Sequence, residues 1–234
     1  MRLHRAIALV VFVLVTFAPP LTAKLERLEA PDPGRGTIGV RISAQFGKAR
    51  ESADTVYFAR VGDPAQAQGA PVLIPSNFGK ARNVYLLNVR PGRYVVAAAE
   101  LGRSMPTTRT VVVFSKDDSA LTEVEVKAGT VAFVGEITAV TSMKSRELDE
   151  TQARTLNAVM TTSATLGVMD RALGADFAYP ATIKNVDRGD EVELDFWSSA
   201  SHNHFRGEDA WVSLIEHRPV LRAPVTASTK KQDP

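Results

Sequence analysis

The chain has 234 residues, of which 44% are hydrophobic and 23% are charged, so it has ample material for a buried core. It contains no cysteine, which excludes disulfide bonds, thiol catalysis, zinc–thiolate sites and iron–sulfur clusters. The 28 basic and 26 acidic side chains nearly balance, and the length fits one large domain or one domain with a helical appendage.

Residues 1–23 have the order of features typical of a secretory signal peptide. Two arginines precede an apolar run over 6–17, and small residues follow up to Ala23. That run is shorter than the roughly 20 residues of a membrane-spanning helix. We therefore expect cleavage near Lys24, a periplasmic or secreted protein and no transmembrane span after cleavage, the alternative being an uncleaved N-terminal anchor. Residues 24–36 are expected to form a linker.

The segment 37–141 is rich in Val, Tyr, Phe and Thr, and turn residues interrupt it at regular intervals. Several short strands at such spacing are typical of an all-β sandwich or barrel. We predict a seven-stranded antiparallel β-sandwich. Its expected strands are Thr37–Ile42, Asp54–Val61, Asn83–Leu87, Arg93–Ala99, Thr108–Phe114, Leu121–Val126 and Thr130–Val140.

Charge is divided unevenly along the chain. Residues 35–109 contain 11 basic and 4 acidic side chains, whereas residues 110–234 contain 13 basic and 19 acidic ones. One interpretation is that the basic half meets an anionic envelope component, such as lipid headgroups or a polyanionic polymer. The other is that the two halves pack together and neutralise each other. We expect no nucleic-acid partner.

A five-residue repeat lies in the basic half: Phe46–Arg50 recurs as Phe78–Arg82. A single short match is too little for a repeat architecture. Two basic loops can nevertheless grip an anion between them, since Lys and Arg bind phosphate and carboxylate groups well. The alternative is two solvated loops. The candidate anion-binding residues are Lys48, Arg50, Lys80 and Arg82.

Pro91-Gly92 predicts a tight turn, because Pro presets the first central position of a type II turn and Gly supplies the positive φ of the second. The surrounding residues Val89, Tyr94 and Val96 complete a pattern that resembles the carboxypeptidase-regulatory-like and transthyretin-like sandwiches of bacterial envelope proteins. A later step, Val124 to Gly129 leading to Phe133, is similar to the same group. The resemblance spans roughly residues 37–140 and implies a transthyretin-like fold and a mostly noncatalytic module.

After residue 141 the period changes from strand to helix. Acidic residues from Glu147 precede an apolar stripe that predicts a helix to about Leu173. Residues 191–196 alternate as a strand would, but a four-residue spacing of apolar side chains favours a helix over Asp190–Phe205, followed by a short helix over Asp209–His217. The predicted fold class is therefore α+β, with a helical segment at 142–218 packed on the sandwich and a flexible tail at 219–234.

The histidines that follow residue 23 lie within one short stretch near several acids. Imidazole and carboxylate together can hold zinc or copper, so His202, His204 and Glu208 are candidate metal ligands. The spacing matches no recognised ligand motif, and the alternative is an exposed His202 with a partly buried His204.

Familiar catalytic motifs are absent from the sequence, including the nucleophile elbow, the zinc-protease motif and the phosphate-binding loop. We therefore expect no catalytic residue and no cofactor. The favoured function is a noncatalytic exported envelope protein that binds a ligand or a protein partner or helps an assembly. The alternative is a metal-dependent hydrolase that uses the histidine and acid cluster.

Overall fold

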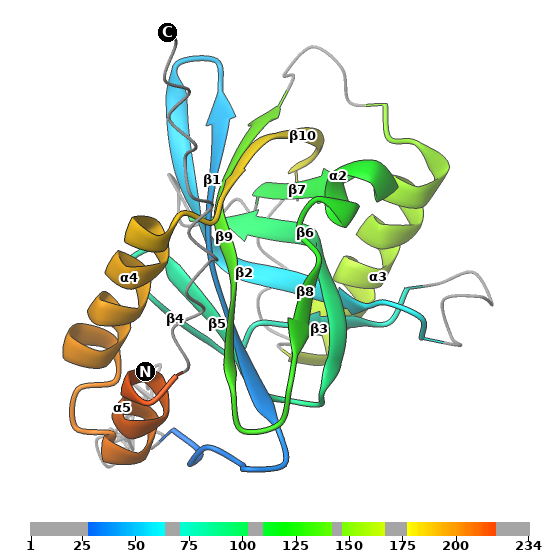
Figure 1. Cartoon of the computed structure of the whole chain (residues 1–234). Coiled ribbons are helices and arrows are strands. Elements are labelled where there is room, and N and C mark those ends of the chain that lie inside the picture. The colour runs from blue at the N-terminus through cyan, green and yellow to red at the C-terminus, as the bar shows by residue number, and fades with distance from the viewer. Residues whose placement is uncertain (1–27, 64–70, 103–109, 142–146, 167–176, 219–234) are drawn as a thin grey trace, which may run out of the picture.

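The computed structural model describes residues 28–63, 71–102, 110–141, 147–166 and 177–218, and these residues form ten strands and a few helices (Figure 1). The strands are β1 Gly36–Phe46, β2 Ala49–Arg60, β3 Leu73–Pro75, β4 Phe78–Lys80, β5 Asn83–Val89, β6 Gly92–Leu101, β7 Thr110–Phe114, β8 Val124–Val126, β9 Val131–Thr141 and β10 Phe177–Asp187. The helices are α2 Lys116–Ala120, α3 Glu150–Leu166, α4 Asp190–Ser199, the π-helical turn η2 Ala200–His204, and α5 Asp209–Glu216.

Six of these strands close into a mixed barrel in the order β1, β2, β6, β7, β10 and β9, and the other four lie outside it. Two of the pairings in the barrel are parallel, β1 with β9 and β7 with β10. Outside the barrel, β3 pairs with β2, β8 with β6, β5 with β1 and β4 with β5. The prediction of a seven-stranded antiparallel sandwich is therefore wrong.

The strand that closes the barrel, β10, lies within the segment where only helices were expected. It runs parallel to β7 from Phe177 and antiparallel to β9 from Ala181 onward. Pro180 lies just before the pairing with β9 begins. Proline lacks an N–H donor and argues against a central strand, so the sequence pattern concealed this element.

Strand β1 changes its antiparallel partner halfway along its length. Residues 36–41 pair with β5, whereas residues 43–46 form a hairpin with β2. On its other side β1 pairs with β9 over nearly its full length. Because β5 and β2 pair with the same edge of β1 in succession, the two strands must separate from each other near residue 42, where β1 changes partner.

The barrel interior is filled by aliphatic and aromatic side chains, and β1 contributes Ile38, Val40 and Ile42, which are fully buried. The outer face of β1 is buried as well, because α4 packs over it. Gly39 lies at the closest approach, where an added Cβ would be 2.4 Å from the Phe196 ring. Burial on both faces explains why β1 is almost continuously apolar or small rather than alternating.

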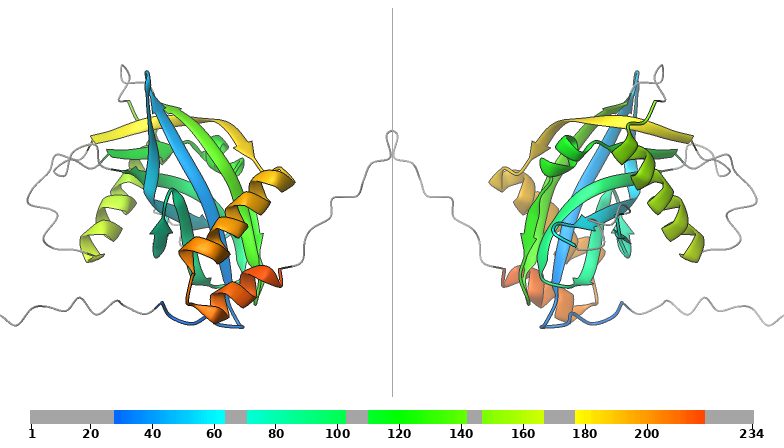
Figure 2. Two further views of the ribbon diagram at one scale, coloured as in Figure 1. Left: turned by 90° about the vertical axis from the view of Figure 1, so that its left-hand side faces the viewer. Right: turned by 90° about the vertical axis from the view of Figure 1, so that its right-hand side faces the viewer.

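Two helical layers cover opposite sides of the barrel (Figure 2). In one, α4, η2 and α5 pack Phe196, Trp197, Phe205 and Trp211 against β5 and β9. In the other, α3 packs Val159 onto strands β2, β6 and β7. The helices predicted at 190–205 and 209–217 are confirmed, and of the helix predicted to Leu173 the part to Leu166 is confirmed, while the rest lies outside the described residues.

The tight turn predicted at Pro91-Gly92 is not formed as a type II turn, because Gly92 is already the first residue of β6. Strands flank the dipeptide, and Gly92 has a φ of 153°. The two flanking strands, β5 and β6, belong to different parts of the sheet and do not pair with each other. Within the described ranges, no helix has both the length and the apolar character needed to cross a lipid bilayer.

Candidate functional site

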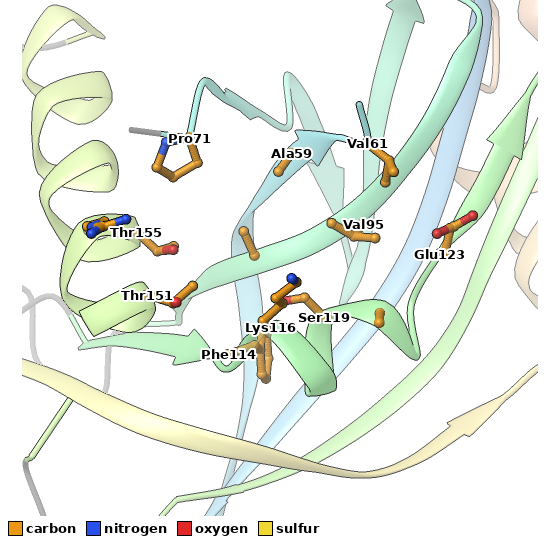
Figure 3. A pocket seen from close by; sticks show the side chains of 13 residues that line it. Ala59, Val61, Pro71, Val95, Phe114, Lys116, Ser119, Glu123, Thr151 and Thr155 are labelled. Carbon is orange, nitrogen blue, oxygen red and sulfur yellow. The ribbon is translucent and has the colours of Figure 1, made fainter. Parts of the chain in front are cut away.

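A cavity of about 460 Å³ lies between α3, α2 and the outer face of barrel strands β2 and β6. Figure 3 shows Thr151 and Thr155 of α3 on one side of it, Val95 of β6 on the other side, and Lys116 and Ser119 of α2 between them. The volume is within the range of about 300–1,000 Å³ typical of small-molecule sites.

The walls of the cavity are mostly apolar. The outer face of the sheet contributes two small residues here, Ala59 of β2 and Ala97 of β6. Because α3 rests on larger neighbours such as Val111 and Val113, these alanines leave a space beneath the helix. The remaining apolar lining consists of Val61, Pro71, Val95, Phe114 and Ala120.

Two largely buried residues, Thr155 and Ser119, contribute hydroxyl groups to the lining of this space. Neither side-chain hydroxyl has a hydrogen-bond partner among the described residues. Both hydroxyls are therefore available to a molecule inside the cavity.

The charged groups at the rim of the cavity differ in whether they have an ion-pair partner. Arg154 pairs with Glu150 one turn earlier on α3, and the Glu123 carboxylate lies 3.0 Å from Arg93 Nε. Lys116 has no ion-pair partner among the described residues, and its side chain extends from α2 into the cavity (Figure 3). The charge that the site offers to a ligand is therefore positive.

The α2 wall is positioned by a capping interaction. Ser115 Oγ accepts a hydrogen bond from the Asp118 backbone N–H at 3.1 Å and donates to the Asp118 carboxylate at 2.7 Å. The other carboxylate oxygen of Asp118 accepts from the Ile183 N–H of β10 at 2.9 Å. At the far end of α2, the Thr122 hydroxyl accepts from the Val96 N–H of β6 at 2.7 Å, which docks the helix onto the barrel.

The α3 wall begins with a reciprocal capping box. The Gln152 N–H donates to Asp149 Oδ1 at 2.8 Å, and the Asp149 N–H donates to Gln152 Oε1 at 3.0 Å. This site was not identified in the sequence analysis. The patterns Ser-x-x-Asp at Ser115 and Asp-x-x-Gln at Asp149 are helix-start signals that could have located both walls.

The five-residue repeat does not have equivalent structures in its two copies. In the first copy Gly47-Lys48 form the two-residue turn between β1 and β2, and Gly47 has a φ of 58°. In the second copy the turn between β4 and β5 consists of Ala81-Arg82, with φ values of 49° and 75°. The turn is thus shifted by two residues within the repeat.

The four candidate anion-binding residues fall into two hairpins. Lys48 lies at the tip of the first, and Arg50 beside it donates to Ser43 Oγ at 2.7 Å. Lys80 and Arg82 line a small cavity of about 260 Å³ at the second hairpin, where Lys80 Nζ donates to the Asn203 carbonyl at 2.9 Å. The structure brings each pair together in its own hairpin, and the lining of this small cavity includes neither Lys48 nor Arg50.

The candidate metal ligands diverge. His202 is exposed and its Nδ1 lies 2.9 Å from the Ser198 carbonyl, whereas His204 is buried with its Nδ1 2.7 Å from the Tyr85 hydroxyl. Glu208 precedes α5, and its carbonyl accepts the first helical hydrogen bonds. Among the residues that the structure describes, no three His, Cys, Asp or Glu side chains are grouped to hold a metal ion.

Burial shifts the pKa values of both His204 and Tyr85. Burial, followed by the positive charges of Lys80 and Arg41, lowers the pKa of His204 below 6.5. Burial raises the pKa of Tyr85 well above its usual value. The His204 Nδ1 contacts Tyr85 of β5 and its Nε2 lies 3.4 Å from the Ser199 hydroxyl of α4, so the imidazole links β5 to the C-terminal helical layer.

Arg41 of β1 is a further polar tie that sequence analysis missed. Its guanidinium donates to Asn83 Oδ1 at 2.9 Å, to Glu136 Oε2 at 3.0 Å and to Asp195 Oδ2 at 3.1 Å. It thereby joins β1, β5, β9 and α4. Such a network depends on residues far apart in the chain, and no local pattern indicates it.

Comparisons with protein-family models, curated proteins and solved structures find no match for this chain.

Proposed function

We propose that the protein is a noncatalytic binding module for a small amphipathic molecule, which occupies the cavity beneath α3. The cavity is the observation that carries this proposal, because its described lining combines apolar walls, two hydroxyl groups and a lysine that have no partner among the residues that the structure describes. Sites for small molecules commonly have this composition, with a few polar groups that orient a mostly apolar ligand.

The arrangement favours a ligand with an apolar body and an anionic or hydrogen-bond-accepting head. The apolar body would lie against Ala59, Val95 and Ala97, where it displaces water from apolar surface. A carboxylate head would accept from the Lys116 ammonium and from the hydroxyl groups of Ser119 or Thr155. Hydrogen bonds to charged groups are each worth about 1.5–3 kcal/mol.

We place this activity in the periplasm or outside the cell, on the basis of the signal-peptide features of residues 1–23. Intact mass spectrometry of protein recovered from the envelope fraction tests the location and the cleavage together. We expect a mass that lacks residues 1–23, and a mass that retains them would contradict cleavage.

The binding proposal is tested with the neutral apolar dye N-phenyl-1-naphthylamine. We expect saturable binding that octanoate and octanol both displace, because both chains compete for the apolar walls. The Ala97→Trp substitution should abolish dye binding by filling the cavity, since Ala97 lies on its floor. The matched control Leu194→Trp adds the same ring to an exposed position on α4 and should leave binding intact.

The Lys116→Gln variant separates the two parts of the ligand. Displacement by octanoate should weaken about tenfold or more, while displacement by octanol should not change, because only the carboxylate uses the ammonium group. Absence of saturable dye binding, or equal loss in the Ala97→Trp and Leu194→Trp proteins, would contradict the proposal.

A further inference from the structure

A second cavity, of about 430 Å³, lies where β5 and β2 diverge from their shared edge on β1. Asn77 lines this cavity, and its side chain accepts from the Leu87 N–H at 2.7 Å and donates to the Leu87 carbonyl at 3.1 Å. Apolar side chains including Ile74 and Leu86 line its depth. We call this cavity the arginine slot, because Arg35, Arg60 and Arg90 all line it.

The backbone at Pro91-Gly92 holds Arg60, one of the residues that line the arginine slot. Arg60 Nη2 donates to the Pro91 carbonyl at 2.9 Å, so its guanidinium lies across the turn. A Cβ on Gly92 would be only 2.8 Å from Arg60 Nε, and the positive φ at this position also favours glycine. The positive φ therefore favours glycine at position 92, and the Arg60 guanidinium lies close beside it.

The other two arginines are fixed by backbone contacts. Arg35 Nη1 donates to the Asn88 carbonyl at 3.0 Å, and its Nε lies 3.2 Å from Asp32. The backbone of Arg90 is held by the Tyr94 hydroxyl, which donates to the Arg90 carbonyl at 2.6 Å. The Arg90 guanidinium itself has no hydrogen-bond partner among the described residues, so its donors are available.

Basic side chains outnumber acidic ones in the described lining of the arginine slot. The described lining contains three arginines and a single acid, Asp63, and Asp32 is the acid beside Arg35. The charges of Arg60 and Arg90 also reach the buried Tyr94 phenol, where they oppose the rise in its pKa caused by burial. Guanidinium groups bind carboxylate and phosphate oxygens in a bidentate manner, which a point charge cannot do.

We propose that the arginine slot is a second binding site, for an organic oxyanion whose charged head contacts Arg60 and Arg90 and whose apolar body enters between β5 and β3. The cavity is larger than a bare oxyanion requires, and its apolar depth accommodates the body of such a molecule. This site is separate from the cavity beneath α3, with which it shares no lining residue.

The probes are phenyl phosphate and benzoate, with phenol as the neutral analogue, each titrated into the full-length mature protein by calorimetry. We expect saturable binding of at least one anion and none of phenol. The Arg90→Gln substitution should weaken anion binding about tenfold or more, because it removes a charge-assisted donor that no other described residue engages. Preference for phenyl phosphate or for benzoate distinguishes a phosphate ester from a carboxylate as the natural head group.

Two control variants keep this test specific. Lys48→Gln removes the same charge at the tip of the β1–β2 hairpin and should leave anion binding unchanged. Ala97→Trp fills the cavity beneath α3 and should also leave it unchanged, so failure of one site does not mask the other. Binding of neither anion, or an equal loss in the Arg90→Gln and Lys48→Gln proteins, would overturn the proposal.

Discussion

Adding a single methyl group at Gly39 should destabilise the protein, although Gly→Ala in a strand is ordinarily favourable by about 0.5–1 kcal/mol. The new Cβ would lie 2.4 Å from Phe196 Cε1 and 2.9 Å from Trp197 Cη2. Both rings are fully buried, so neither can rotate into solvent to make room. Overpacking of a core typically costs about 1–3 kcal/mol, which leaves a net loss of up to roughly 2.5 kcal/mol.

Urea denaturation followed by tryptophan fluorescence measures this loss, because Trp197 and Trp211 both lie in the affected layer. The control Gly34→Ala meets only the flexible Asp32 carboxylate at 3.3 Å and should stay within about 0.5 kcal/mol of the parent. In a Phe196→Leu background the Gly39→Ala cost should shrink, since the clashing ring atoms are gone. Equal or greater stability of the Gly39→Ala protein in the parent background would refute the packing of α4 on β1.

Three further predictions follow from the described contacts. The folded state lowers the pKa of His204, so the free energy of unfolding should be highest above about pH 6.5 and should fall as the pH drops toward the pKa of the folded state. The urea midpoint of the His204→Gln protein should lack this dependence on pH. An unchanged pH dependence in that variant would contradict the prediction. Replacing Ala81-Arg82 by Asn-Gly should raise the free energy of unfolding by about 1–2 kcal/mol, because both residues have positive φ, and no gain in urea midpoint would contradict the strained turn. If Lys48 and Lys80 of the two hairpins bind anionic vesicles, binding should weaken with added salt and disappear in the Lys48→Glu/Lys80→Glu protein. Binding that does not depend on salt would mean that these side chains are only solvated and hold no anion.

Individual strands could be predicted from local composition and turn residues. The closure of these strands into a barrel could not be predicted in this way. Segments such as Thr37–Ile42 and Arg93–Ala99 lie within β1 and β6 because their β-branched and aromatic residues suit a pleated, buried surface. The closure depends on parallel pairing of β1 with β9, which links distant parts of the chain and leaves no local pattern. Pro180 further disguised β10, which completes the ring.

The two cavities were hidden for a related reason. Ala97 is an unremarkable residue in a strand, and only the position of α3 above it makes a space. Likewise, Pro91-Gly92 was interpreted as a turn signal. In the structure its Pro91 carbonyl accepts a hydrogen bond from Arg60, a residue 31 positions earlier in the chain. Helix-start patterns at Ser115 and Asp149 were the local signals that pointed toward the cavity beneath α3.

The most direct test of the binding site beneath α3 uses the absence of cysteine from the chain, because a single engineered thiol then reports on one position. Thr151→Cys places the thiol at an exposed position that lines the cavity, and Ser213→Cys places one on exposed α5. The rate of alkylation is measured with and without octanoate. We predict slower alkylation at position 151 as octanoate saturates the protein and no change at position 213, whereas equal rates with and without octanoate at both positions would contradict the binding site.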